Sequence, residues 1–364
     1  MLEIEAWVRD LLEKALDGER LTEEEGARLY HAPLPILGMA ADGLRRSLAG
    51  DLATFVIDRN INYTNACVSG CKFCAFYRPP RSGEAYVLGT EELLEKVREA
   101  VTLGATQVLL QGGLNPDLHL EYYERILRVL RDRFPQVQRH ALSPTEIAFI
   151  AHVEKSSVGE VLLRLKEAGL QSIPGGGAEI LDDEVRARIS PKKLGWEGWM
   201  GVMREAHRLG IPSTATMVYG LTEGVEERVR HILRVRELQE ETGGFTAFIP
   251  WSFQPQNTRL AMEYGVAAQG GAEYLRVVAL SRLLLGESIR NVQASWVTQG
   301  PKVAQIALCY GANDFGGTMI EENVVRAAGA RVQYLPPEEI VRLISDLGRE
   351  AAQRDTLYNI LRRY

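Results

Sequence analysis

Cysteine and histidine are scarce in this chain, with four cysteines and six histidines among 364 residues. A disulfide framework needs paired cysteines in an oxidising compartment, and a structural zinc site usually takes four Cys or His ligands, often as two separated pairs. No second pair exists here, because Cys309, His119 and His140 stand alone. We therefore exclude both kinds of site, and we interpret the isolated Cys309 as a small core residue.

Long hydrophobic runs and an excess of positive charge are also lacking. No apolar run approaches the roughly 20 residues that a membrane helix needs, so we expect no membrane association. The net charge of −6 argues against nucleic acid as the main partner. The N-terminal segment is amphipathic but acidic, whereas a mitochondrial presequence is rich in arginine, so we expect a cytoplasmic protein.

From residue 51 onward, apolar β-rich stretches alternate with longer helical ones. This alternation implies βαβ units with parallel strands, and seven or eight repeats favour a closed (β/α)8 TIM-type barrel over an open sheet. Strands are predicted at 53–61, 107–111, 138–141, 171–173, 213–219, 246–251 and 291–294, with a last one before Asn313. Helices are predicted at 90–103, 120–133, 158–168, 196–209, 225–242, 272–285 and 301–310.

No low-complexity linker or break in composition divides the chain. We therefore expect one barrel over residues 51–318, an N-terminal helical extension over 1–50, and a C-terminal helical extension over 319–364 packed on the barrel. Helical periodicity from Leu2 to Leu16 and an N-cap with acids in its first turn at Thr22–Glu25 indicate the first extension.

Three of the four cysteines lie within eight residues, after the first predicted strand. Cys67, Cys71 and Cys74 have the spacing C-x3-C-x2-C, and Phe73 directly precedes the third. Three thiolates on one loop can hold three corners of a [4Fe–4S] cluster, which usually takes four cysteines. One iron is then left without a protein ligand and can bind a molecule that reacts. The spacing therefore predicts a reactive iron–sulfur cluster.

Glycines paired with polar or aromatic residues follow the other predicted strands. Active sites of (β/α)8 barrels lie at these carboxyl ends, and glycine lets a backbone approach a ligand closely. Each segment alone has an ordinary structural explanation, such as a helix-entry turn or a core histidine, but their common placement favours one binding site. The segments are Gln111–Gly113, His140–Glu146, Pro174–Glu179, Met217–Gly220, Pro250–Pro255, Ala294–Gly300 and Gly311–Thr318.

The stretch Asn62–Phe76 around the cysteines resembles the radical S-adenosylmethionine (SAM) enzymes, in the branch that acts on futalosine- and deazaflavin-type substrates. The segments at 111–113, 140–144, 173–179 and 311–314 resemble the same branch, and the resemblance runs from about residue 20 to the C-terminus. Residues 75–78, 245–255 and 294–301 look most like the cyclases that act on dehypoxanthine futalosine in the futalosine route to menaquinone.

This resemblance implies an enzyme that binds a [4Fe–4S] cluster and SAM. Reductive cleavage of SAM would yield a 5′-deoxyadenosyl radical that takes hydrogen from C4′ of the substrate ribose. The C4′ radical would add to the benzoate ring, and loss of an electron and a proton would restore aromaticity. The substrate must be held rigidly, because such a radical abstracts whatever hydrogen lies nearest. An electron donor such as flavodoxin or ferredoxin is implied as a partner.

The resemblance also implies roles for single residues. Phe73 would lie beside the SAM adenine, and Glu179 would accept hydrogen bonds from the SAM ribose. The segment Gln111, Gly112 and Gly113 would meet the methionine amino group. His140 and Tyr219 stay open as alternative bases for the final deprotonation. Substrate contacts are implied for Ser143, Ser295 and Asp314, and a substrate carboxylate wants a cation, for which Arg78 and Arg81 are candidates.

Alternative functions remain open at this point. Within the same branch, an aminofutalosine synthase-type enzyme would add the radical to an enolpyruvyl double bond, and a deazaflavin chromophore synthase-type enzyme would act on different substrates. Outside the enzymes, an electron-transfer or metal-storage protein would use the cluster structurally, with four ligands and no cleavage of SAM.

Overall fold

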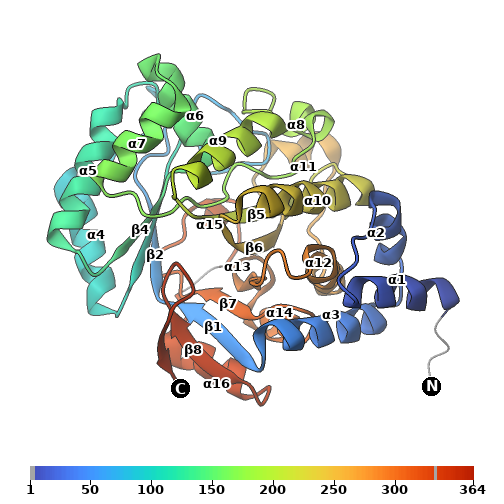
Figure 1. Ribbon diagram of the computed structural model, residues 1–364. Helices are drawn as coiled ribbons and strands as arrows, with labels where there is room; N and C mark the ends of the chain where they lie inside the picture. The colour runs from blue at the N-terminus through green and yellow to red at the C-terminus, as the bar shows by residue number, and fades with distance from the viewer. Residues whose placement is uncertain (1–4, 332–333) are drawn as a thin grey trace.

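Parallel strands surrounded by helices form the centre of the computed structural model, which describes residues 5–331 and 334–364 (Figure 1). β1 and β2 are two halves of one stretch of chain, separated by Ile57. The strands are β1 (Leu52–Val56), β2 (Asp58–Asn62), β3 (Gln107–Gln111), β4 (Gln138–Ala141), β5 (Ser213–Tyr219), β6 (Phe245–Ser252) and β7 (Asp314–Gly317).

The pairing of these strands closes a ring. β2 pairs with β3, β3 with β4, and β5 with β6, all in parallel. Parallel bridges at residues 172 and 173 join β4 to β5, bridges at 292 and 293 join β6 to β7, and β7 pairs with β1. The predicted (β/α)8 barrel is confirmed, although its fourth and seventh strands are reduced to single bridges. The last strand begins at Asp314, later than expected, because Asp314 is the residue that pairs with Thr54.

Helices follow the strands in the expected alternation. Two of them begin with a capping box, at Ser143 for α6 and Ser157 for α7, where a serine and a glutamate three residues on satisfy the first backbone amides. The helices are α4 (Thr90–Thr102), α5 (Leu120–Arg133), α6 (Pro144–Glu154), α7 (Val158–Ala168), α8 (Asp183–Ile189), α9 (Trp196–Arg208), α10 (Val225–Thr242), α11 (Arg259–Tyr264), α12 (Gly271–Leu285), α13 (Trp296–Gln299) and α14 (Pro301–Ala307).

The N-terminal segment is helical, as predicted. It forms α1 (Ala6–Leu16), α2 (Glu23–Tyr30) and α3 (Leu34–Ala49), and the expected cap at Thr22 is a capping box with Glu25. Residues 2–4 of the first predicted helix lie outside the described residues. α2 packs against α10 and α3 packs against α12, so the extension covers one side of the barrel (Figure 1).

The C-terminal segment differs from the helical extension that we expected. It contains α15 (Val324–Ala327) and α16 (Pro337–Ser345), but also β8 (Glu350–Arg354) and β9 (Ile360–Arg363). β8 runs parallel to β1 and pairs with it from Leu52 to Phe55, below the point where β3 begins to pair with β2. The sequence of β8, EAAQR, consists of strong helix formers. Pairing with β1 and complete burial of Ala351 and Ala352 override that preference.

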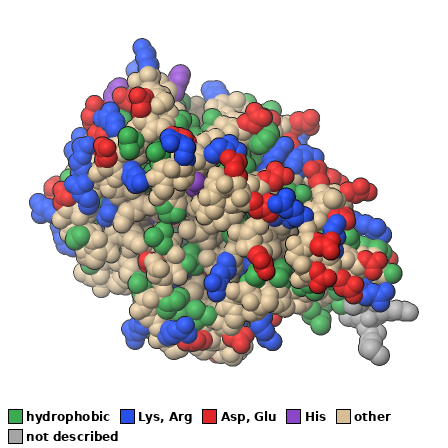
Figure 2. Space-filling view, in the orientation of Figure 1, with side chains coloured by type: hydrophobic (Ala, Val, Ile, Leu, Met, Phe, Trp, Pro, Cys, Tyr) green, Lys and Arg blue, Asp and Glu red, His purple; other side chains and the backbone are tan. Residues whose placement is uncertain are grey.

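On the surface, Figure 2 shows acidic and basic side chains intermixed over the face in view, with acidic ones gathered towards the end that carries α1 and α2. None of the described helices is long and apolar enough to cross a membrane.

Cys309 is exposed. The expectation of a core thiol there is therefore wrong, because the residue lies just after the end of α14 and not on its buried side.

Candidate functional site

A cavity of about 380 Å³ opens inside the barrel, at the carboxyl ends of the strands. Residues from the Cys loop, from the segments that follow β3, β4 and β6, and from the C-terminal segment line it together. The sequence-predicted residues that line it are Cys67, Cys71, Cys74, Phe73, Gln111, Gly112, Gly113, His140, Ser143 and Glu179. The structure thus brings the predicted cofactor residues to one place.

The Cys loop is fastened to the barrel by its own backbone. The amide of Cys67 donates to the Arg78 carbonyl at 2.9 Å, and that of Lys72 donates to the Ile189 carbonyl at 2.9 Å. Cys71 is buried, and its Sγ lies 3.1 Å from the Ser69 hydroxyl. Burial raises the pKa of the Cys71 thiol to about 11, while the nearby Lys193 ammonium opposes that shift. A bound metal would stabilise the thiolate far more than Lys193 does.

Gly112 and Gly113 are required by close packing under the Cys loop. A Cβ on Gly113 would lie 2.2 Å from the Ala66 carbonyl oxygen, and one on Gly112 would lie 2.5 Å from the Tyr63 ring. The Gly112 amide donates to Glu146 Oε1 at 2.9 Å and the Gly113 amide to the Thr64 carbonyl at 3.0 Å. Their carbonyl oxygens accept no hydrogen bond from the described residues. They can therefore accept one from an ammonium group in the cavity.

Glu179 and Lys193 form a buried ion pair on the cavity wall. Lys193 Nζ lies 2.7 Å from Glu179 Oε1 and 5.3 Å from the centre of the Phe73 ring. Glu179 has a positive φ of 41°, which is unusual for a residue with a Cβ and is typical of strained functional positions. Its Oε2 is buried and accepts no hydrogen bond from any described residue; the nearest cation, Arg186, lies 3.6 Å away. A buried carboxylate oxygen without a donor can receive a ligand hydroxyl.

These residues fit a [4Fe–4S] cluster and SAM. Three cysteine thiols on one loop would supply the cluster ligands, and the open Oε2 of Glu179 suits a diol. The unpaired carbonyls at Gly112 and Gly113 suit an amino group, and the Phe73 ring offers a flat apolar face. Lys193 adds a cation beside Cys71 that the sequence reasoning missed, because nothing in the segment Pro191-Lys192-Lys193 distinguishes a buried lysine from an exposed one.

His140 and Ser143 lie on the same wall, but each has a structural task. His140 Nδ1 lies 2.6 Å from the Ser172 hydroxyl, and burial lowers the pKa of the imidazole to about 3, with the Arg354 charge adding to the effect. Ser143 caps α6, and its hydroxyl donates to Glu146 Oε2 at 2.6 Å. His140 is therefore neutral and weakly basic, and the hydroxyl of Ser143 is already engaged.

Tyr219 and Ser295 do not line the cavity, contrary to expectation. Side chains alternate along β5, and Thr214, Thr216 and Val218 take the inner face. Tyr219 therefore points outward to the helices, where the Arg228 guanidinium lies 5.0 Å from its ring. The hydroxyl of Ser295 lies 2.9 Å from that of Thr298, and Thr298 is the residue of that segment that reaches the cavity.

Arg78 and Asp314 are also outside the cavity wall. Arg78 pairs with Glu84 and donates to the Tyr77 carbonyl at 3.0 Å, so it braces the Cys loop from outside. Arg81 is exposed and does not reach the cavity. Asp314 is fully buried and holds Arg354 through both carboxylate oxygens, with Nη2 to Oδ1 at 3.0 Å. Neither Arg78 nor Asp314 therefore lines the cavity, and the substrate contacts expected of them stay predictions.

The opposite end of the cavity is a polar floor that the sequence reasoning did not find. Asp58 of β2 and Arg354, Thr356 and Tyr358 of the C-terminal segment line it. The Arg354 guanidinium stacks on the Tyr358 ring at 4.0 Å. Asp314 and the Asp355 carbonyl take three of its five N–H donors, which leaves two. No pattern in the sequence indicated this floor, because Asp58 and Arg354 are almost 300 positions apart and meet only through β8.

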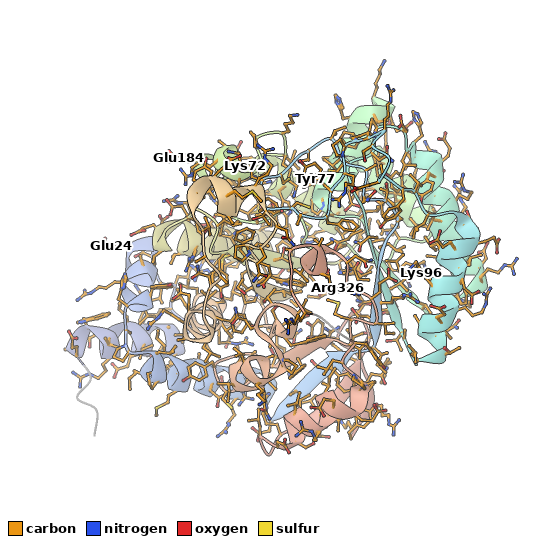
Figure 3. The ribbon with its side chains drawn as sticks, turned by 180° about the vertical axis from the view of Figure 1, so that it is seen from behind. Glu24, Lys72, Tyr77, Lys96, Glu184 and Arg326 are labelled. Atoms are coloured by element: carbon orange, nitrogen blue, oxygen red, sulfur yellow. The ribbon has the colours of Figure 1, made fainter. Side chains whose placement is uncertain are left out.

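Figure 3, seen from behind, shows Lys72 and Tyr77 of the Cys loop near the upper rim, with Arg326 of α15 below them. The side chains of Tyr77 on the loop and of Val324, Val325 and Ala328 around α15 line the cavity between these parts. The Cys loop and the short segment around α15 therefore form two sides of the entrance.

Comparison with known families matches nearly the whole chain. The description "Radical SAM superfamily" matches residues 61–235, and "CofH/MqnC C-terminal region" matches residues 242–363. Among solved structures, methylornithine synthase has a TM-score of 0.73 at 19% identity, covering 93% of this chain and 96% of its own. The [FeFe]-hydrogenase maturase HydG has a TM-score of 0.75 at 16% identity, covering 95% of this chain and 76% of its own. At these identities the likeness shows the fold.

Curated relatives are much more similar in sequence. A cyclic dehypoxanthine futalosine synthase of Halalkalibacterium halodurans is 48% identical, covering 97% of this chain and 95% of the relative. A 5-amino-6-(D-ribitylamino)uracil–L-tyrosine 4-hydroxyphenyl transferase of Methanothermobacter thermautotrophicus is 46% identical, covering 98% of both. A second cyclic dehypoxanthine futalosine synthase, of Streptomyces coelicolor, is 43% identical, covering 97% of this chain and 89% of the relative.

Proposed function

This chain belongs to the radical SAM superfamily, whose enzymes use a [4Fe–4S] cluster and SAM, and we propose that it closes a ring on dehypoxanthine futalosine. The product would be cyclic dehypoxanthine futalosine, and the reaction would belong to menaquinone biosynthesis. The position of the segments that resemble cyclases supports this choice of reaction. Ala75, Phe76 and Tyr77, residues of β6 and Thr298 all line the cavity. The positions that look most like cyclases are thus those that would face the substrate.

Each end of the cavity would have its own task. When bound on Cys67, Cys71 and Cys74, the cluster supplies the electron that cleaves SAM to a 5′-deoxyadenosyl radical. Glu179 Oε2 would accept from the SAM ribose, and the carbonyls of the Gly112–Gly113 segment from the methionine amino group. Phe73 would cover the adenine. The external electron would come from a small redox protein of the flavodoxin or ferredoxin class.

The substrate would occupy the remaining cavity between the Cys loop and the floor. Its aromatic part suits the apolar and aromatic wall of Ile249, Trp251 and Phe253. Its hydroxylated ribose suits polar side chains such as Gln254 and Thr298. Rigid placement between these walls would present C4′ to the radical and withhold other hydrogens. The C4′ radical would then add to the aromatic ring, and loss of an electron and a proton would complete the product.

The second candidate is the transferase activity named for the Methanothermobacter relative, whose 46% identity lies between the 48% and 43% of the two cyclases. That name describes transfer of a 4-hydroxyphenyl group from tyrosine to a ribitylamino-uracil, so both candidates combine an aryl group with a five-carbon polyol. Gln254 and Thr298 suit either polyol, so the choice between the two candidates depends on the apolar and aromatic wall of Ile249, Trp251 and Phe253.

A substrate panel tests the proposal. The reduced, cluster-loaded protein is incubated with SAM and either dehypoxanthine futalosine, or 5-amino-6-(D-ribitylamino)uracil with L-tyrosine, or an enolpyruvyl substrate of the aminofutalosine synthase type. We expect 5′-deoxyadenosine and a product lighter by two hydrogens with dehypoxanthine futalosine alone. A 4-hydroxyphenyl adduct of the uracil, or a SAM-derived adduct of the enolpyruvyl compound, would overturn the proposal.

A further inference from the structure

Ring closure releases a proton from the aromatic ring, and some group on the cavity wall has to accept it. Apart from Glu146, the carboxyl and imidazole side chains of the described residues that line the cavity away from the cysteines and the Glu179–Lys193 pair are His140, Glu322 and Asp58. Glu146 also lines it, but Ser143, Tyr63 and the Gly112 amide occupy its oxygens. The low pKa of His140, about 3, makes it a weak base at neutral pH.

Glu322 is a carboxylate with no free oxygen. Its Oε1 accepts from the Val324 amide at 3.1 Å, and its Oε2 accepts from the Val325 amide at 3.0 Å and the Arg326 amide at 3.4 Å. The side chain therefore holds the start of α15 in place. Burial raises the pKa of Glu322 to about 7, but both of its oxygens already accept backbone hydrogen bonds, so neither is free of a protein partner.

Asp58 is held in place but keeps one oxygen free. It is 3% exposed, its backbone amide donates to the Thr318 hydroxyl oxygen at 3.1 Å, and its Oδ1 accepts from the Met319 amide at 3.0 Å. Oδ2 accepts no hydrogen bond from the described residues, although the side chain lines the cavity. A Cβ on Gly317 would lie 2.2 Å from Oδ1. Only glycine at 317 leaves room for the carboxylate to sit there.

The charged groups around Asp58 leave its carboxylate able to accept a proton. Arg354 of β8 is the nearest cation, but it is committed to Asp314 of β7 through two hydrogen bonds. Gln107, the partner of Asp58 on β3, is uncharged. Burial raises the pKa of Asp58 to about 6; the Met319 amide and Arg354 oppose this, and Asp314 adds to it. A pKa near the working pH is what an effective general base needs.

We infer that Asp58 is the catalytic base, and that its Oδ2 accepts the aromatic proton released after ring closure. This inference rests on the proposed function. The C4′–aryl bond forms first and leaves an unpaired electron on the ring. The ring C–H bond then breaks, its proton passes to Oδ2, and one electron leaves to a one-electron acceptor of the oxidised iron–sulfur class. The carboxyl proton is returned to water when product leaves.

The test is a single-turnover assay with SAM and dehypoxanthine futalosine on four variants of the cluster-loaded protein. Asp58→Asn keeps an oxygen for the Met319 amide but cannot take a proton. We expect cyclic product to form about 100-fold more slowly than in the wild type, while 5′-deoxyadenosine still forms at nearly the wild-type rate. Asp58→Glu should recover part of the lost rate. Asp51→Asn, whose side chain is 67% exposed, should behave like the wild type. Glu322→Gln should slow 5′-deoxyadenosine and product together, because it loosens the start of α15, and should keep their wild-type ratio.

Other outcomes would overturn the inference. Equal loss of 5′-deoxyadenosine and product, with a raised KM, would make Asp58 a binding residue, and an unchanged product rate would make it dispensable. Loss of cyclic product without loss of 5′-deoxyadenosine in Glu322→Gln alone would assign the base to Glu322. If wild-type protein forms no cyclic product, the proposed function fails instead.

A measurement on the wild type covers the case in which Asp58→Asn does not fold. The product-forming rate should rise with pH through about 6 and then level off, as the Asp58 carboxyl ionises beside Arg354 and Asp314. The same midpoint should persist in Glu322→Gln. A rate that does not change from about pH 5 to about pH 8 would contradict the assignment.

Discussion

The two ends of the cavity are built in opposite ways. At the cluster end, Cys67, Cys71 and Cys74 lie on one loop, the two glycines follow β3, and Glu179 follows the bridge segment at 172–173. At the floor, Asp58, Asp314 and Arg354 come from the start, the end and the tail of the barrel, and they meet only because β8 pairs with β1. Chemistry shared by a superfamily can be encoded locally, whereas the polar floor of the cavity depends on the complete fold.

The largest effect is expected at the cluster end. Cys67→Ala removes one of three cluster ligands, so we expect loss of bound iron and of all SAM cleavage with little change in folding. Iron content and electron paramagnetic resonance of the reduced protein check this. Cys309→Ala, which changes the exposed cysteine, should retain both. A Cys67→Ala protein that still cleaves SAM would contradict the site assignment.

The next largest effect is expected on the free energy of unfolding, from a substitution at the polar floor. Arg354→Met leaves the fully buried Asp314 without its cation, so the free energy of unfolding should fall by about 3–5 kcal/mol. Denaturant unfolding measures it. Arg363→Gln breaks an exposed pair with Glu350 on the neighbouring strand and should cost less than about 1 kcal/mol. Equal losses in the two variants would mean that the floor is not a buried ion pair in solution.

The floor should also give the unfolding free energy a pH dependence. Burial raises the pKa of Asp58 from its ordinary 3.8 to about 6, so the folded state binds the proton more tightly than the unfolded state. The wild type should therefore lose up to about 3 kcal/mol relative to Asp58→Asn as the pH rises from about 4 to about 6, with no further change above. Parallel unfolding curves of the two proteins over this range would show that Asp58 is not buried.

A smaller effect is expected for SAM affinity. Glu179→Gln keeps the shape of the side chain but replaces a charged acceptor by a neutral one and leaves Lys193 without its partner. Since a charge-assisted hydrogen bond is stronger than a neutral one by about 1–1.5 kcal/mol, SAM should bind about tenfold more weakly. Titration of the reduced cluster with SAM measures this affinity. Glu160→Gln, at the exposed start of α7, is the matched control and should bind SAM normally.

The same contrast explains what the sequence could predict. The barrel and the cofactor wall were predictable, because strand–helix periodicity and the C-x3-C-x2-C spacing are local. β8 was not, since EAAQR favours a helix until β1 offers a pairing edge. Tyr219 was misjudged by one position in a strand whose inner face belongs to Val218. Asp314 was predicted as a substrate contact, whereas in the structure it pairs with Arg354, a partner that cannot be identified without the fold.

Isotope transfer tests the central claim, that the two ends act on one substrate held between them, most directly. Dehypoxanthine futalosine carrying deuterium at C4′ of its ribose is incubated with SAM and the reduced protein. Our account predicts one deuterium in the 5′-deoxyadenosine and cyclic product formed alongside it. Unlabelled 5′-deoxyadenosine, or consumption of substrate without any 5′-deoxyadenosine, would contradict it.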